Sequence, residues 1–267
     1  MKLSISYYSL HGKAGDTFEF IKFCHKNGVK YVELLDYHLS STEDIKKVNL
    51  LIKELNMGVS SYSISNDFVQ TTEIARKAQV ELMKSKIDLA LLLNTKVLRV
   101  FSGEAKAGIS FDVAKNWIVD CYKEVVKYAE EKDVTLCIEN HGLFVGRSIQ
   151  VKALIEAVGS KAFRSTLDTG NFLLQNEDPL EAVKYLKDYI GFVHFKDLKK
   201  VDKGFASLNG TMYGGTALNS GDVPLKEIIK FLKQIRYDGF ISLELEEGEN
   251  DILLDNIESL DFVKVLL

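Results

Sequence analysis

Apolar, strand-like segments alternate with amphipathic, helix-like segments along this chain, and this alternation constrains its fold more than any other feature. The strand-like segments are short and rich in β-branched residues, and they lie at 3–9, 30–35, 58–65, 95–101, 134–139, 163–168, 190–196 and 239–245. The helix-like segments carry apolar residues at three- and four-residue steps, and they lie at 16–27, 42–56, 71–93, 110–132, 148–159, 178–188, 224–235 and 251–265. Strands separated by helices pair in parallel, because each crossover buries a helix against the sheet. Eight such units in 267 residues predict one (β/α)8 barrel domain that spans residues 1–267.

Residues that favour helix starts stand where the helix-like segments begin. The side chains of Asp16, Ser110 and Ser148 can accept hydrogen bonds from the free amides of a first helical turn. Asp178 can do the same, and it is followed by Pro179, which suits the first helical position. We therefore predict N-caps at these four polar residues.

The rival architecture is a doubly wound open sheet, which usually binds a dinucleotide at a glycine-rich turn after its first strand. Residues 9–15 read SLHGKAG and do not match the pattern G-x-G-x-x-G. We therefore expect a closed TIM barrel, in which the active site lies at the C-terminal ends of the strands.

Composition narrows the functional class. Lys and Arg number 34 and Asp and Glu number 38, which gives a net charge of −4, whereas proteins that bind nucleic acid without sequence preference usually carry excess positive charge. The three cysteines are odd in number and widely spaced, so they form neither a disulfide framework nor a zinc knuckle. No signal peptide and no apolar stretch of about 20 residues is found. We expect a soluble cytoplasmic protein that acts on a small molecule, with no nucleic-acid or membrane partner.

Four of the last five predicted strands end in a potential metal ligand. Strand alternation points Glu139, Asp168, His194 and Glu244 toward the inside of the barrel, and Glu246 shares the parity of Glu244. Each residue alone could simply close a local salt bridge. Together, three close carboxylates repel one another by about 4 kcal/mol per pair at 4 Å, so protonation or a bound cation must relieve the strain. Three carboxylates and one imidazole suit one divalent ion such as Mn²⁺, Co²⁺, Mg²⁺ or Zn²⁺.

Ordered motifs at these strand ends resemble those of the xylose isomerase-like TIM barrel superfamily, the sugar phosphate isomerase/epimerase group. The motifs are 138–142 (IENHG), 167–171 (LDTGN), 193–197 (VHFKD) and 238–244 (DGFISLE), with weaker likenesses at 28–34 and 219–224. Each motif alone is weak, but the ordered set spans nearly the whole chain. The resemblance implies that Glu139, Asp168, His194 and Glu244 bind one divalent metal ion, with Glu246 as the alternative to Glu244.

The resemblance also implies the chemistry. The metal would hold two neighbouring oxygens of a sugar or a similar hydroxy-carbonyl compound and stabilise the enediolate that forms when an α-proton leaves. Glu139 and Glu244 would then be the catalytic residues, one removing the proton and the other returning one. Such relatives are often oligomers, so a homo-oligomer is expected from the resemblance alone.

Further residues are candidate substrate contacts, each with a plain structural alternative. They are His141, Asn171, Lys196, His11 and Glu33. Lys196 can instead pair with a carboxylate, and Glu33 can pair with Arg99 near the barrel floor without a role in catalysis. Asn171 stands where several members of the superfamily have a histidine, which argues against chemistry with several metals.

Three other functions stay open. The apurinic endonucleases of the same superfamily need three metals and extra histidines, which this chain lacks. Inosose and dehydroshikimate dehydratases share the scaffold and begin with the same proton abstraction, so a lyase is the main alternative. A non-catalytic sugar binder is the third. The substrate, its phosphorylation and the identity of the metal are not determined by the sequence, and the glycine-rich stretch 197–223 is either a mobile cover of the active site or an irregular loop.

Overall fold

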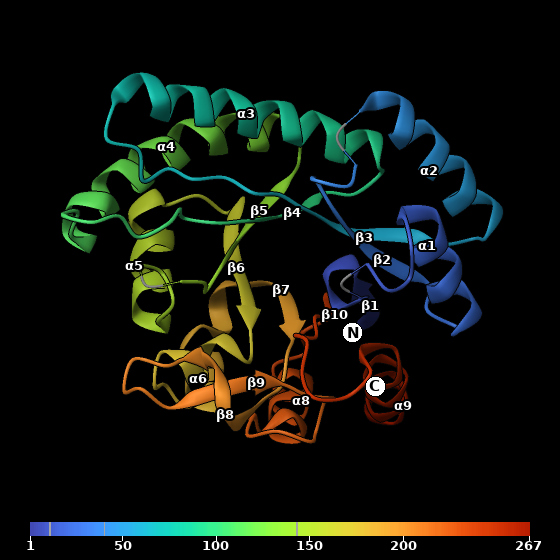
Figure 1. The fold of residues 1–267 in the computed structure, drawn as a ribbon. Helices are drawn as coiled ribbons and strands as arrows, with labels where there is room; N and C mark the ends of the chain where they lie inside the picture. The colour runs from blue at the N-terminus through green and yellow to red at the C-terminus, as the bar shows by residue number, and fades with distance from the viewer. Residues whose placement is uncertain (11, 40, 143) are drawn as a thin grey trace.

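The computed structural model describes residues 1–10, 12–39, 41–142 and 144–267, and its centre is a closed barrel of parallel strands (Figure 1). The barrel strands are β1 (Lys2–Ser6), β2 (Tyr31–Leu35), β3 (Gly58–Ser63), β4 (Val97–Val100), β5 (Thr135–Glu139), β6 (Phe163–Asp168), β7 (Ile190–Phe195) and β10 (Phe240–Leu243). They are hydrogen-bonded in the order β1-β10-β7-β6-β5-β4-β3-β2, and β1 closes the ring by pairing with both β2 and β10. The predicted (β/α)8 barrel is confirmed.

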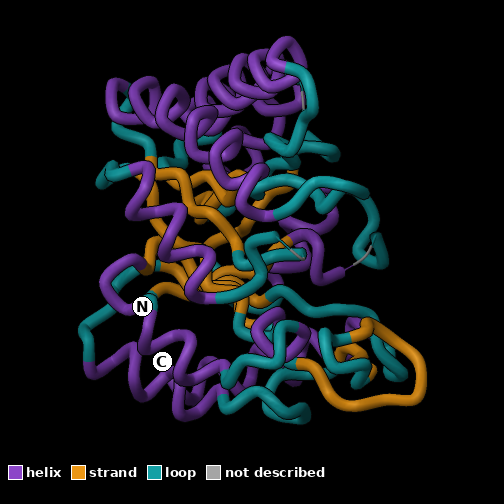
Figure 2. Tube along the Cα trace, turned by 90° about the vertical axis from the view of Figure 1, so that its left-hand side faces the viewer, coloured by secondary structure: helices purple, strands orange, loops and turns teal. Residues whose placement is uncertain are grey.

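Helices surround the strands and bury their apolar faces against them (Figure 2). The helices are α1 (Thr17–Lys26), α2 (Thr42–Glu54), α3 (Glu73–Leu92), α4 (Phe111–Glu131), α5 (Ser148–Val158), α6 (Asn171–Leu174), α7 (Pro179–Tyr185), α8 (Leu225–Gln234) and α9 (Ile252–Leu266). Short 3-10 turns lie at η1 (Tyr7–Leu10) and η2 (Lys187–Tyr189). In the part of the chain that the structure describes, no helix is long and apolar enough to cross a membrane.

Helix starts follow the predicted capping chemistry with one exception. Asp16 accepts hydrogen bonds from the amides of residues 18 and 19, and Ser110 and Asp178 cap α4 and α7. The predicted cap at Ser148 is wrong, because Arg147 is the N-cap residue of α5 and Ser148 already lies within the helix. The hydroxyl of Ser148 donates instead to Glu177, 2.9 Å away, so the side chain is turned toward a neighbouring carboxylate.

The stretch 197–223, expected to be a loop, contains a two-stranded antiparallel hairpin. Its strands are β8 (Leu198–Ala206) and β9 (Met212–Gly215), which lie outside the barrel beside α6 in Figure 1. Most of β8 beyond its first residues is exposed. A parallel bridge between Gly215 and Gly248 ties the hairpin to the segment that follows β10.

The strand register brings polar side chains to one end of the barrel. Asp168 on β6 lies opposite His194 on β7, and His194 lies opposite Ser242 on β10. Glu139 ends β5 and pairs with Thr166 on β6. Four neighbouring strands therefore deliver their last inward side chains to the same place.

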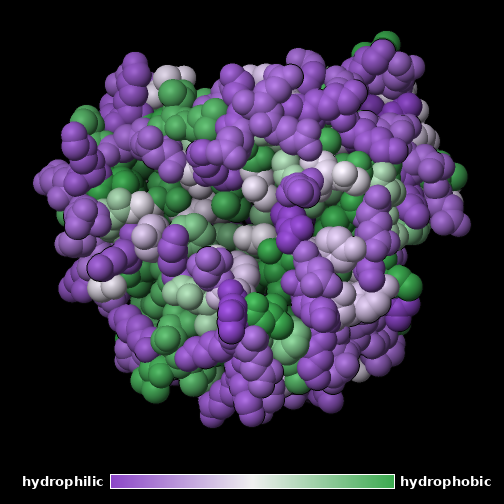
Figure 3. All heavy atoms as spheres, turned by 180° about the vertical axis from the view of Figure 1, so that it is seen from behind, coloured by the Kyte–Doolittle hydropathy of each residue, from purple (hydrophilic) through white to green (hydrophobic). Residues whose placement is uncertain are grey.

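Charged and polar side chains cover most of the face drawn in Figure 3, and apolar groups form patches between them. The core lies below this surface, between the barrel and its helices, and contains large side chains such as Phe20, Tyr62, Tyr122 and Phe163 that are almost fully buried.

Candidate metal centre

Four side chains from four adjacent strand ends meet inside the mouth of the barrel. Glu139 and Asp168 end β5 and β6, His194 is the next-to-last residue of β7, and Glu244 directly follows β10. Each offers one ligand atom, and these atoms all lie within 4.8 Å of one another. All four residues are buried, with no more than 5% of their surface exposed. The sequence predicted this convergence, and the structure brings the four residues together.

In each of these four residues, one polar atom is held by the protein, and in Glu244 it is Oε1, which lies 3.0 Å from Lys196 Nζ. Asp168 Oδ1 accepts from the amides of Gly170 (3.0 Å) and Asn171 (2.9 Å). Glu139 Oε1 accepts from Asn171 Nδ2 at 3.2 Å, and His194 Nε2 lies 3.0 Å from Glu33 Oε1. Such partners fix the orientation of a ligand side chain before any metal arrives.

The other polar atom of each residue makes no hydrogen bond among the described residues. These atoms are Glu139 Oε2, Asp168 Oδ2, His194 Nδ1 and Glu244 Oε2. Each of these atoms lies at ion-pair distance from another buried group, and His194 Nδ1 and Glu244 Oε2 lie 3.1 Å from each other. None of these contacts is a well-formed hydrogen bond, so a cation shared by all four atoms would improve their pairing. Three carboxylate oxygens and one imidazole nitrogen are a ligand set that divalent cations accept. The cluster could therefore bind a metal ion, and its residues fit one.

Two buried cations already lie beside the cluster. Lys196 Nζ is 2.9 Å from Asp168 Oδ2, 3.0 Å from Glu244 Oε1 and 3.1 Å from Glu246 Oε1. Arg99 Nε is 3.2 Å from Glu139 Oε2. These contacts offset part of the repulsion between the carboxylates.

The charges shift the pKa values of the cluster in different directions. Burial would raise the pKa of Glu244, but His194 and Lys196 outweigh burial and lower it to about 2. Burial raises the pKa of Asp168 to about 6, against the opposing charge of Lys196. Burial would lower the pKa of His194, but the carboxylates of Glu244 and Glu33 raise it to about 10. Carboxylates and a charged imidazole thus share this site when no other cation occupies it.

The remaining predicted site residues fall in different places. Glu246 is outside the four-residue cluster and binds Lys196 and the hydroxyl of Tyr8 (2.9 Å from Oε2). His141 is exposed and packs against the ring of Phe101 at a tilt of 47°, with 4.8 Å between ring centroids. His11 lies outside the residues that the structure describes.

The predicted pairing of Glu33 with Arg99 at the barrel floor is wrong. Glu33 pairs with His194 and accepts a hydrogen bond from Ser63, while Arg99 forms an ion pair with Glu139. Both side chains therefore end at the four-residue cluster, Arg99 beside Glu139 and Glu33 beside His194.

Sequence reasoning missed two buried residues that support the cluster. Asn140 accepts from the amide of Asp168 (2.8 Å) and donates to its carbonyl (2.9 Å), which locks β5 to β6. Ser9 donates to the carbonyl of Leu243 (2.7 Å) and accepts from the amide of Leu245 (3.0 Å). Asn140 stood within a motif and could have been singled out, whereas no sequence signal indicated Ser9.

A family model described as "Xylose isomerase-like TIM barrel" matches residues 21–263. Among curated relatives, the inosose dehydratase of Clostridium perfringens is 28% identical over 127 residues, which cover 45% of this chain and 43% of that enzyme. The chain thus spans less than half the length of the inosose dehydratases that it matches.

Solved structures share the fold over the full length of the chain. The D-psicose 3-epimerase of Clostridium cellulolyticum H10, solved with D-tagatose, aligns with a TM-score of 0.82 and 17% identity and covers 100% of this chain and 99% of its own. IolI protein, solved with a bound zinc atom, aligns with a TM-score of 0.81 and 17% identity and covers 100% and 98%. At these identities the likeness shows the fold.

Proposed function

The chain belongs to the xylose isomerase-like TIM barrel family, and from this premise we propose that it is a divalent-metal-dependent isomerase or epimerase of a sugar or a similar hydroxy-carbonyl compound. The observation that carries the proposal is the convergence of four buried side chains whose ligand atoms, one from each residue, all lie within 4.8 Å of one another. Glu139, Asp168, His194 and Glu244 would hold the ion. When bound, a divalent ion supplies Lewis acidity that favours loss of a proton next to a carbonyl group.

In this proposal the two glutamates transfer that proton. Around the barrel the four strands follow the order β10-β7-β6-β5, so Glu244 and Glu139 are the outer pair and Asp168 and His194 lie between them. A substrate bound at the centre would have one glutamate toward each side. Glu139 or Glu244 removes the α-proton, the enediolate forms, and the other glutamate returns a proton from the opposite side.

Neighbouring side chains keep these two carboxylates in place. Asn171 holds Oε1 of Glu139, Arg99 lies beside its Oε2, and Lys196 lies beside Oε1 of Glu244. Arg99 and Lys196 also place positive charge where the enediolate develops negative charge, which favours that intermediate.

The test is solvent-proton exchange at the carbon next to the carbonyl. Protein supplied with Mg²⁺, Mn²⁺, Co²⁺ or Zn²⁺ is incubated in deuterated water with ketoses and inososes, and mass spectrometry detects deuterium in the carbon skeleton. We expect exchange in the wild type and a loss of at least about 100-fold in Glu139→Gln and in Glu244→Gln, since acid–base catalysis contributes about 10²–10⁴.

The control is Glu177→Gln, which changes a partly buried carboxylate that binds Ser148 away from the cluster. It should exchange at the wild-type rate. Unchanged exchange in both Glu139→Gln and Glu244→Gln would eliminate the acid–base assignment.

A dehydratase is the second candidate, favoured by the buried ammonium of Lys196 between Asp168 and Glu244 and by the likeness to inosose dehydratase. After the same proton abstraction, a lyase expels a β-hydroxyl group, which a nearby cation can stabilise. The same incubation separates the two: a product of unchanged composition supports the isomerase, and a product that has lost one water supports the lyase.

A further inference from the structure

A cavity of about 480 Å³ is lined by Asn140, the residue directly after Glu139, and by Asn171, and none of the four cluster residues lines it. Asn140 and Asn171 line this cavity, and Asn171 Nδ2 lies 3.2 Å from Glu139 Oε1. His141, directly after Asn140, lines it as well. Asn171 thus touches both the cluster and this space, which we call the side cavity, and a substrate that reached past Asn171 would place its remaining carbon atoms there.

The side cavity is lined by uncharged groups, apart from the titratable ring of His141. Leu174, Phe205 and Leu208 offer apolar surface, and Asn140, Asn171 and Gln175 offer amides. No Lys, Arg, Asp or Glu is among the described residues that line it. An apolar wall opposite amide groups suits a hydroxylated carbon skeleton, which presents C–H groups to one side and hydroxyl groups to the other.

The charges next to the side cavity disfavour an anion. Arg99 and Lys196 are the cations in contact with the cluster among the described residues, and both are already bound to carboxylates. The carboxylates gathered there are Glu33, Glu139, Asp168, Glu244 and Glu246. A phosphate brings a charge of about −1.5 to −2 and is normally received by Arg or Lys.

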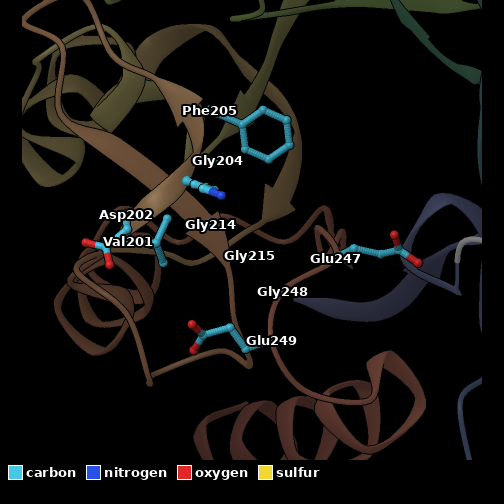
Figure 4. A pocket seen from close by; sticks show the side chains of 10 residues that line it. Val201, Asp202, Gly204, Phe205, Gly214, Gly215, Glu247, Gly248 and Glu249 are labelled. Carbon is cyan, nitrogen blue, oxygen red and sulfur yellow. The ribbon is translucent and has the colours of Figure 1, made fainter.

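A second cavity, of about 670 Å³, lies between the hairpin β8–β9 and residues 247–249. Its lining is also unsuited to an anion. Figure 4 shows the carboxylates of Asp202, Glu247 and Glu249 around it, and Lys203 is the one basic residue among its described lining. Phe205 lines both cavities, so the hairpin separates the side cavity from a more acidic one.

We propose that the substrate of this site is an uncharged polyhydroxy carbonyl compound, a free ketose or inosose, and neither a phosphate ester nor a carboxylate. This inference rests on the proposed function and adds the substrate class to it. Its basis is the uncharged lining of the side cavity beside a cluster whose five carboxylates still exceed, by one charge, the four positive charges of Arg99, Lys196 and a bound divalent ion.

Matched pairs of probes test the proposal. Deuterium uptake is measured for D-fructose against D-fructose 6-phosphate, and for inosose against 3-dehydroshikimate. We expect the uncharged member of each pair to have a kcat/KM at least about 10-fold higher, because like charges brought together in a binding site repel each other.

A variant that adds a positive charge to the side cavity should shift the substrate preference toward the anionic probe. Leu208→Arg places a guanidinium in the lining and should narrow the preference for D-fructose over its phosphate by about 10-fold or more. Leu50→Arg is the matched control: Leu50 is 70% exposed on α2 and lies near Gly58, where β3 begins, so its charge should leave the preference unchanged.

Calorimetric binding of the same pairs separates the two proposals. If the phosphate ester is exchanged as fast as the free sugar, the substrate class is overturned and the proposed reaction stands. If no compound exchanges but the uncharged probes bind more tightly, the proposed reaction fails and the substrate class stands. Tighter binding of the anionic probes without exchange would overturn both.

Discussion

Ser9 shows how a residue outside the cluster can hold a cluster residue in place. Its hydroxyl bonds to the main chain of Leu243 and Leu245, the two neighbours of Glu244. The paired register of β1 and β10 ends at Ile5 and Leu243, so the side chain of Ser9 continues the connection where the backbone ladder stops. Ser9 is itself fully buried.

We therefore predict that Ser9→Ala weakens metal binding about 10-fold, in line with the loss that follows removal of groups that orient ligands. The control is Ser4→Ala, since Ser4 is also fully buried and bonds to Ser60 at 2.6 Å without touching the cluster. Titration with Mn²⁺ or Zn²⁺ measures both affinities. Equal affinities in the two variants would show that Ser9 acts on stability alone.

Glu244 and Glu246 have the same strand parity, and the sequence could not choose between them. In the structure Glu244 lies in the cluster, whereas Glu246 pairs with Lys196 and accepts a hydrogen bond from Tyr8. We predict that Glu244→Gln lowers metal affinity by 10-fold or more, whereas Glu246→Gln keeps both the affinity and a stoichiometry of one ion per chain. Equilibrium dialysis with metal analysis measures the affinity and the stoichiometry of both variants. A larger loss of affinity in Glu246→Gln than in Glu244→Gln would make Glu246 the fourth ligand.

At the scale of elements, the barrel could be predicted from the sequence because its strands are apolar and its helices carry an apolar stripe. The β8–β9 hairpin was not predicted from the sequence, because most of Leu198–Ala206 is exposed and shows little of the apolar pattern of a buried strand. Helix α6, Asn171–Leu174, has a single turn and is too short to show helical periodicity.

The site was predictable in part for the same reason. Inward parity at the strand ends indicated Glu139 and its three partners, because alternation along a strand is local information. The partners of Glu33 and Arg99 were not predictable, since they depend on which buried charges meet across the barrel.

The β8–β9 hairpin is in close contact with the segment that follows β10. A Cβ atom added to Gly215 would lie 2.1 Å from the carbonyl oxygen of Glu246, so any side chain there must displace that segment. We predict that Gly215→Ala destabilises the protein by about 1–3 kcal/mol and also slows proton exchange, because the segment carries the partner of Lys196.

Gly210→Ala provides the comparison. Gly210 has a φ of +84° with open space around its Cβ position, so alanine there costs about 1–2 kcal/mol of backbone strain without touching the segment. Thermal unfolding should therefore detect both variants, and proton exchange should be slowed in Gly215→Ala alone. Wild-type exchange in Gly215→Ala would separate the hairpin from catalysis.

For the whole molecule, the cluster links four of the eight barrel strands, so its occupant should stabilise the entire barrel. An ion present at 100 times its Kd adds about 2.7 kcal/mol. We predict that removal of metal by a chelator lowers Tm by about 5–10 °C for a chain of this size, and that added divalent ion restores it.

Differential scanning calorimetry before and after chelation measures this shift. The doubly substituted chain Glu139→Gln with Asp168→Asn should unfold at the same temperature with and without added ion. A wild-type Tm that does not respond to chelation or to added Mg²⁺, Mn²⁺, Co²⁺ or Zn²⁺ would argue against a resident ion.

The ring closes where β1 meets β10, so the first and last strands of the barrel are neighbours (Figure 1). Glu244 and its support Ser9 stand 235 residues apart in the chain, and neither is in place until both have been synthesised. During translation, a nascent chain that still lacks its final strand has an open sheet edge and only three of the four cluster residues. A metal ion that needs all four ligands can therefore bind only after β10 and Glu244 have joined the barrel.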